Sequence, residues 1–151
     1  MNIAPAQPVS EFRTRRRVEF ADTDMAGIVH FARFFVYMES AEHELLRSIL
    51  GTEAHFEYEG HEIGWPRAKA TCTYQSPARL GDVLEIRVLI RRKGNRSLTY
   101  GFEITCGDRR IAEGELVTIC CRMNEKPLRS VEIPPPLASR LAEYQAAEVL
   151  T

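Results

Sequence analysis

Two carboxylates lie one residue apart in the segment Phe20–Phe35, which reads FADTDMAGIVHFARFF. A glycine and a run of aromatic residues follow Asp22 and Asp24. Carboxylates in such a position can cap a helix, bind a metal ion, accept a phosphoryl group or act as a catalytic base. The segment therefore allows several kinds of chemistry, and the residues around it must decide among them.

The metal and phosphoryl-transfer interpretations both need residues that this segment lacks. A calcium loop of the D-x-D-x-D-G type requires a third oxygen ligand at the position of Ala26. An aspartyl-phosphatase signature requires Thr or Val there, followed by alternating strands and helices, and neither is present. The four cysteines also lack the spacing of metal ligands, so we predict no metal.

Length and composition predict a single globular domain with no membrane span. The chain has 151 residues, of which 44% are hydrophobic and 27% are charged. A net charge of -1 excludes a general affinity for nucleic acid or anionic membranes. Free, mostly buried thiols and the lack of a signal-like N-terminus favour a cytoplasmic protein. We expect residues 1–11 to form a flexible lead-in.

A long amphipathic helix is predicted directly after the two aspartates. A first strand over residues 12–20 precedes them. From about residue 30 to 50, apolar side chains recur at three- and four-residue steps, and charged residues, including Glu39 and Glu42, lie mostly off that face. Gly51 follows where helices commonly end in a left-handed residue.

The remainder of the domain alternates between apolar and polar residues, which predicts strands over 67–75, 82–92, 97–105 and 110–121. Turn sequences between them are typical of antiparallel neighbours and predict a four-strand meander. Three prolines at 134–136 then open a tail, residues 134–151, compatible with a short helix. The pattern predicts an α+β fold in which one long helix is wrapped by a curved antiparallel sheet of about five strands. Because one helix covers only part of such a sheet, we expect oligomerisation through a sheet edge or face.

At the residue level, the string VEFADTDMAGIVHF, followed by FxxYMESA, resembles the 4-hydroxybenzoyl-CoA thioesterase family, including its Tol–Pal-associated members. The residues that match the family pattern are Asp22, Asp24, Gly27, Val29, Tyr37 and Glu39. The resemblance covers residues 12–133 and implies a hot-dog fold and hydrolysis of an acyl-CoA thioester. It implies no cofactor, because coenzyme A is part of the substrate.

The resemblance also implies roles for individual residues. Asp24 matches the family's catalytic carboxylate, as nucleophile or general base, and Asp22 is expected to tie the loop. The backbone amides of His30 and Phe31 match those that hold the thioester carbonyl, with the His30 side chain alternatively lining the pocket. A helix N-terminus suits this role because its N–H groups are unpaired and its dipole favours negative charge. The residues expected to line the substrate pocket are Gly27, Val29, Trp65 and Pro66.

Coenzyme A carries phosphates, so a cationic site is expected nearby. The turn RRKGNRS places several cations together, and Lys93, Arg96 and Ser97 match the family's nucleotide contacts. The alternative is a solvated turn that protects a sheet edge. The resemblance further implies a homodimer, paired into a tetramer in many members, with active sites at the dimer interface.

The sequence leaves open an alternative function and the roles of several helix residues. A non-catalytic hot-dog module that binds acyl-CoA as a sensor or scaffold is the alternative to an enzyme. The family helix often has Tyr at the position of Phe34 and Arg at that of Glu42, which weakens any transfer of substrate preference. Glu39 is compatible with a solvated or a subunit-bridging carboxylate.

Overall fold

The structure is a computed structural model that describes residues 11–145. Of the predicted lead-in, residues 1–11, only Glu11 falls in this range, and residues 146–151 of the predicted tail lie outside it.

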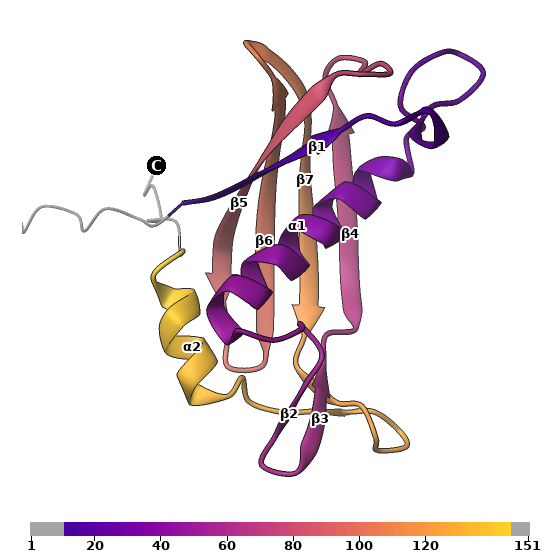
Figure 1. The fold of residues 1–151 in the computed structure, drawn as a ribbon. Helices are drawn as coiled ribbons and strands as arrows, with labels where there is room; N and C mark the ends of the chain where they lie inside the picture. The colour runs from indigo at the N-terminus through magenta and orange to yellow at the C-terminus, as the bar shows by residue number, and fades with distance from the viewer. Residues whose placement is uncertain (1–10, 146–151) are drawn as a thin grey trace, which may run out of the picture.

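Five antiparallel strands form the main sheet, in the order β1-β5-β6-β7-β4 (Figure 1). The strands are β1 (Phe12–Arg17), β4 (Arg67–Tyr74), β5 (Val83–Lys93), β6 (Ser97–Cys106) and β7 (Arg109–Ile119). Their apolar side chains meet in one core, which includes the fully buried Tyr100 and Phe102 on the central strand β6. The prediction of a mixed domain with about five antiparallel strands is confirmed.

The predicted meander is correct for β5, β6 and β7 but wrong for β4. Strand β4 pairs with β7, with Cys72 opposite Gly114, and the segment after β4 crosses the end of the sheet to reach β5. A side chain at Gly114 would clash with Met38 of the helix, since an added Cβ would lie 2.0 Å from its sulfur. Turn residues show that the chain reverses but not which strand it then joins, so this pairing depends on packing.

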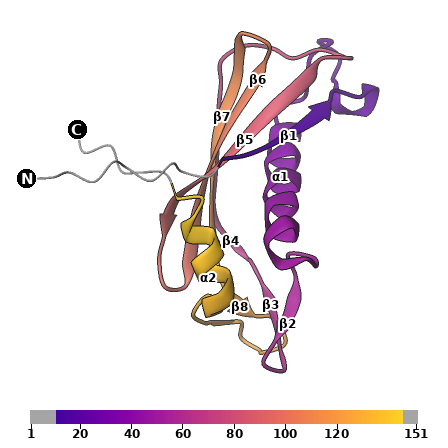
Figure 2. The same cartoon turned by 60° about the vertical axis from the view of Figure 1, so that its left-hand side comes forward.

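Helix α1 (Arg33–Leu50) lies across the inner face of the sheet (Figures 1 and 2). Its buried side chains include Phe34, Tyr37, Met38, Ala41, Leu45 and Leu46. The helix begins at Arg33 rather than near residue 30, because His30 to Arg33 form a turn in which the Arg33 N–H donates to the His30 carbonyl (2.9 Å). Gly51 ends the helix at φ 69°, in the left-handed region predicted for it.

Glu42 is fully buried, so its expected place off the apolar face is wrong. Its carboxylate receives two hydrogen bonds from Arg67 at the start of β4, at 2.6 and 2.7 Å. A buried carboxylate is tolerated when a guanidinium matches both of its oxygens. The helix is therefore tied to β4 by an ion pair between residues far apart in sequence, which helical periodicity does not reveal.

A small sheet and a second helix extend the domain at one end. The small sheet contains β2 (Phe56–Tyr58), β3 (His61–Gly64), β8 (Cys121–Arg122) and β9 (Arg129–Ser130). The predicted strand 110–121 therefore divides at Cys120, whose N–H donates to the Arg96 carbonyl (2.7 Å). Helix α2 (Pro135–Ala142) buries Leu137 and Leu141 in the core. Neither helix in residues 11–145 is long and apolar enough to cross a membrane.

Strand β4 is an open edge of the main sheet. Among the described residues it pairs with β7 alone. From Ala68 to Tyr74 every residue except Cys72 is exposed, including those on the face toward the helix. An exposed edge strand presents unpaired backbone groups that can pair with another chain.

Asp22 ties the chain that enters α1. Its buried side chain accepts hydrogen bonds from the Glu19 N–H (2.9 Å) and the Arg33 guanidinium (2.8 Å). Its backbone carbonyl accepts the His30 N–H (2.8 Å), and the buried ring of Tyr37 lies beside it. Burial raises the pKa of Asp22, but these donors lower it more, so the pKa lies below its ordinary value. The predicted loop-tying role is confirmed.

Replacing the guanidinium tests this tie. Arg33→Gln is expected to lower the free energy of unfolding by about 2 kcal/mol at neutral pH, because a buried carboxylate loses its charged donor. Because the pKa of Asp22 is lower in the folded state, its ionised carboxylate stabilises the fold at pH values above the ordinary pKa of 3.8. This stabilisation is lost as the pH falls through the folded-state pKa. The deficit of the variant should therefore shrink in acid.

Urea unfolding at a fixed protein concentration measures the effect, with Arg17→Gln, at an exposed end of β1, as the control. A deficit that stays constant down to acid pH would contradict the account.

Candidate active site

A cleft of about 440 Å³ opens at the N-terminal end of α1. Its walls are mainly apolar and include Ile28, Val29, Phe31 and Phe34. Asp24 is the only carboxylate among the described residues that line it. One acidic side chain therefore faces a pocket suited to an apolar or aromatic group.

The loop that carries Asp24 is closed by its own backbone. The Asp24 N–H donates to the Ile28 carbonyl (3.0 Å), and the Gly27 N–H donates to the Asp24 carbonyl (3.0 Å). Gly27 has φ 76°, a conformation that residues with a Cβ rarely adopt. One oxygen of the exposed Asp24 carboxylate accepts the Ala26 N–H (2.9 Å), which orients it. Val29 lines the cleft as predicted, whereas Gly27, also predicted to line it, instead shapes the loop beside it.

The backbone N–H groups just before α1 differ in whether they are free to hydrogen-bond a substrate. The His30 N–H donates to the Asp22 carbonyl, so it is not free to hold a substrate carbonyl as the sequence suggested. The Ala32 N–H donates to Nδ1 of His30 (3.1 Å), whose ring stacks on Phe31. The Phe31 N–H has no hydrogen-bond partner among residues 11–145. Of the two predicted amides, only that of Phe31 is available.

Tyr74 connects the cleft to β4 and was not predicted as a site residue. Its hydroxyl donates to the Phe31 carbonyl (2.8 Å), and its ring meets that of Phe34 edge-on at 5.4 Å. The Val29 N–H likewise donates to the Ala78 carbonyl (2.8 Å) in the crossing after β4. The one sequence signal was a single aromatic residue at the end of this strand, whose sequence is RAKATCTY.

Trp65 and Pro66 do not line this cleft. Trp65 lines another cavity, at the opposite end of β4, and its indole N–H donates to the Ala54 carbonyl (3.0 Å). The Pro66 carbonyl accepts the Ile119 N–H (3.0 Å). Within one chain, these two residues are separated from Asp24 by the length of β4.

The cationic hairpin lies at the other end of the main sheet from Asp24. Lys93 ends β5 and Ser97 begins β6, whereas the cleft is lined by Tyr74 to Ala78, shortly before β5 begins. The 11 residues of β5 separate the two ends by about 35 Å at ~3.3 Å per residue. Arg96 lies 3.4 Å from the carbonyl and hydroxyl of Ser130. One chain does not bring Asp24 and this hairpin to one site.

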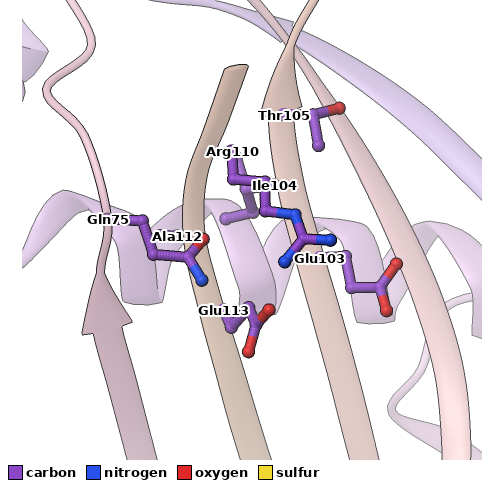
Figure 3. A pocket seen from close by; sticks show the side chains of 7 residues that line it. All are labelled: Gln75, Glu103, Ile104, Thr105, Arg110, Ala112 and Glu113. Carbon is purple, nitrogen blue, oxygen red and sulfur yellow. The ribbon is translucent and has the colours of Figure 1, made fainter. Parts of the chain in front are cut away.

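A smaller hollow of about 120 Å³ lies on the outer face of the sheet (Figure 3). Arg110 extends toward Glu103 and Glu113, which lie directly opposite each other on β6 and β7. Glu103 is already paired with Arg87 (3.0 Å). This hollow is a solvated network of charges, and no group of three or more His, Cys, Asp or Glu in the described part of the chain could hold a metal ion.

Known proteins share both sequence and fold with this chain. YbgC of Escherichia coli O6:H1, an acyl-CoA thioester hydrolase, is 31% identical over 113 residues, covering 72% of this chain and 81% of YbgC. A 1,4-dihydroxy-2-naphthoyl-CoA hydrolase of Synechococcus elongatus is 27% identical over 138 residues, covering 90% and 96%. The structure of Slr0204, a 1,4-dihydroxy-2-naphthoyl-CoA thioesterase from Synechocystis, has the same fold, with a TM-score of 0.72 at 22% identity over 88% of this chain and 96% of that one.

The sequence model of the thioesterase-like superfamily matches residues 18–141. That range contains the Asp24 loop, the helix that follows it, and the whole main sheet after β1. The chain therefore belongs to the thioesterase-like superfamily.

Proposed function

We propose that this protein hydrolyses an acyl-CoA thioester to the free acid and coenzyme A at the Asp24 cleft. The observation that carries the proposal is that the Asp24 carboxylate lies in an apolar cleft at the N-terminal end of helix α1. The names of YbgC and of the Synechococcus elongatus relative, both hydrolases of CoA thioesters, support it.

The proposed chemistry divides between Asp24 and the helix end. Asp24 either removes a proton from an attacking water or attacks the carbonyl carbon itself, forming a mixed anhydride that water then cleaves. In both routes the C–S bond breaks, and coenzyme A leaves as a thiolate that takes up a proton. The Phe31 N–H, at the positive end of the α1 dipole, stabilises the charge that develops on the carbonyl oxygen.

A second copy of the chain is proposed to complete the site. The Asp24 cleft and the hairpin of Lys93, Arg96 and Ser97 lie at opposite ends of the sheet, and β4 is an open edge between them. Two such edges paired antiparallel about a two-fold axis place one end of each copy beside the other end of its partner. Phe31, 63% exposed, lies at this edge, where its carbonyl accepts the Tyr74 hydroxyl, and its side chain is suited to burial in the dimer.

The proposed dimer supplies the cationic group for the coenzyme A phosphates in trans. Arg96 and Lys93 of one copy are then at the end of the molecule where the other copy presents Asp24. Guanidinium groups bind phosphates through paired charged hydrogen bonds, and Lys acts as a point charge. Ser97 adds a hydroxyl at the same turn.

The Asp24 carboxylate is tested by Asp24→Asn, which keeps the side-chain shape and removes the base. Hydrolysis over a panel of short, long and aromatic acyl-CoA esters should fall by at least about a hundredfold. Asp108→Asn, in the exposed β6–β7 turn, is the matched control and should retain full activity. Wild-type activity in Asp24→Asn would reject the assignment of Asp24, and binding without hydrolysis by the wild-type protein would indicate an acyl-CoA-binding module instead.

The hairpin is tested by Arg96→Ala. Loss of one charged hydrogen bond to a phosphate should raise KM for an acyl-CoA about tenfold and leave kcat unchanged. The matching acyl-pantetheine ester lacks the nucleotide, so its KM should not change. Arg15→Ala, at a side chain 75% exposed, is the control. An equal rise for both esters would make Arg96 a structural residue acting through Ser130, and no rise would make the hairpin a solvated turn.

The β4 edge is tested by Ala70→Glu. Ala70 is exposed in the single chain and lies on the face toward the helix, so a second copy would bury the added charge. Sedimentation should show a dimer for the wild-type protein and a folded monomer of low activity for the variant. Ala142→Glu, at the exposed end of α2, should remain dimeric. A variant that stays dimeric would exclude this edge as the interface.

A further inference from the structure

The Phe31 N–H, proposed above to hold the thioester carbonyl, lies in the turn just before α1. It shares one planar peptide unit with the His30 carbonyl, which accepts the Arg33 N–H (2.9 Å). The C=O and N–H of a trans peptide point in opposite directions, so this bond turns the Phe31 N–H away from Arg33. One hydrogen bond still lets a peptide unit rotate, so the direction of this N–H depends on what holds the next unit.

The next peptide unit, made of the Phe31 carbonyl and the Ala32 N–H, is held on both sides. The Tyr74 hydroxyl donates to the Phe31 carbonyl (2.8 Å), and the Ala32 N–H donates to Nδ1 of His30 (3.1 Å). Two peptide units that meet at one Cα are related only by its φ and ψ. Fixing the Phe31–Ala32 unit therefore restricts rotation of the unit before it, which carries the Phe31 N–H.

Tyr74 brings this restraint from a distant part of the fold. It is the last residue of β4 and lies 43 residues after Phe31 in the chain. Its ring meets Phe34 edge-on at 5.4 Å, and Phe34 meets the buried Tyr37 edge-on at 5.8 Å. Edge-on aromatic contacts of this kind are favourable. The row of rings therefore fixes Tyr74 against α1 and directs its hydroxyl at the turn.

The proton of the Tyr74 hydroxyl is used within the protein. Partial burial and the nearby Cys72 thiol raise the pKa of Tyr74 above its ordinary value of 10.0, so the hydroxyl is a donor at neutral pH. A tyrosine hydroxyl has one proton, and here the Phe31 carbonyl accepts it. Tyr74 therefore acts on the turn and does not donate to a substrate at the same time.

The His30 side chain also acts on the turn. Its ring stacks on that of Phe31, with the centroids 4.6 Å apart and the planes 28° from parallel. Nδ1 accepts the Ala32 N–H, so this nitrogen carries no proton. Among the described residues, His30 is not one of those that line the Asp24 cleft, where the resemblance alternatively placed its side chain.

We propose that Tyr74 and the His30 side chain are positioning residues that direct the Phe31 N–H at the thioester carbonyl. The inference rests on the proposed thioesterase function and gives neither side chain a contact with the substrate. Loss of either hydrogen bond frees the Phe31–Ala32 unit, and the Phe31 N–H then stabilises the developing charge less well. This stabilisation is greater in the transition state than in the bound ester, so its loss lowers kcat rather than raising KM.

Tyr74→Phe removes the hydroxyl and keeps the ring. For benzoyl-CoA, kcat should fall about tenfold, less than the loss of a whole oxyanion donor, and KM should not change. His30→Phe, which keeps the stacked ring and removes Nδ1, should have the same kind of effect. Because both side chains hold one peptide unit, kcat of the double variant should fall by less than the product of the two single effects. Tyr58→Phe, on β2, is the matched control and should retain full activity.

The carbonyl of a bound ester gives a readout that a purely structural role would not change. Benzoyl-CoA with ¹³C at the thioester carbonyl is bound to Asp24→Asn and to Asp24→Asn combined with Tyr74→Phe. In infrared difference spectra, the C=O band of the second complex should lie closer to that of the free ester. Urea unfolding of both proteins shows that each is folded.

The outcomes separate this inference from the proposed function. A C=O band at the same frequency in both complexes, a rise in KM with unchanged kcat, or single effects that simply multiply in the double variant would each overturn the inference. A wild-type protein that turns over no ester would instead count against the proposed hydrolysis. The C=O band of the bound ester would then still decide whether Tyr74 directs the Phe31 N–H.

Discussion

The burial of one carboxylate, that of Asp22, holds together the segment on which the rest of the site depends. Its side chain receives the Glu19 N–H and the Arg33 guanidinium, and its carbonyl receives the His30 N–H. These bonds fix the path of the chain from β1 into α1. They also occupy the His30 amide and leave that of Phe31 without a partner in the described chain. The two aspartates, which look alike in sequence, thus have different roles. The Asp22 side chain is buried and hydrogen-bonded within the fold, whereas the Asp24 side chain is exposed at the cleft.

Local patterns predicted most of the elements, and distant contacts account for what they missed. Period-two alternation identified the strands, and the apolar repeat identified α1 together with its end at Gly51. Neither pattern could place β4 beside β7, because that pairing joins residues far apart in sequence, such as Cys72 and Gly114. Nor could periodicity show that Glu42 is buried, since its partner Arg67 is 25 residues away in sequence.

The sequence predicted the loop residues at the candidate site but not how residues from distant parts of the fold come together there. Asp24 and Val29 lie at the cleft as the family resemblance implied, while Trp65 and the cationic hairpin lie toward the other end of the sheet. A motif match indicates which residues belong to a site, but it does not show which copy of the chain supplies each residue. The separation of these groups by the length of the sheet is the physical reason for proposing a two-fold dimer, in which opposite ends of two sheets become neighbours.

The central claim is that the Phe31 N–H, just before the N-terminal end of α1, polarises a thioester carbonyl beside Asp24. Infrared difference spectra of an acyl-CoA carrying ¹³C at that carbonyl, bound to Asp24→Asn, test it most directly. The account predicts a C=O band at lower frequency than in the free ester, and loss of this shift in a Phe31→Pro derivative, which has no N–H at that position. A bound ester whose carbonyl band coincides with that of the free ester would contradict the account.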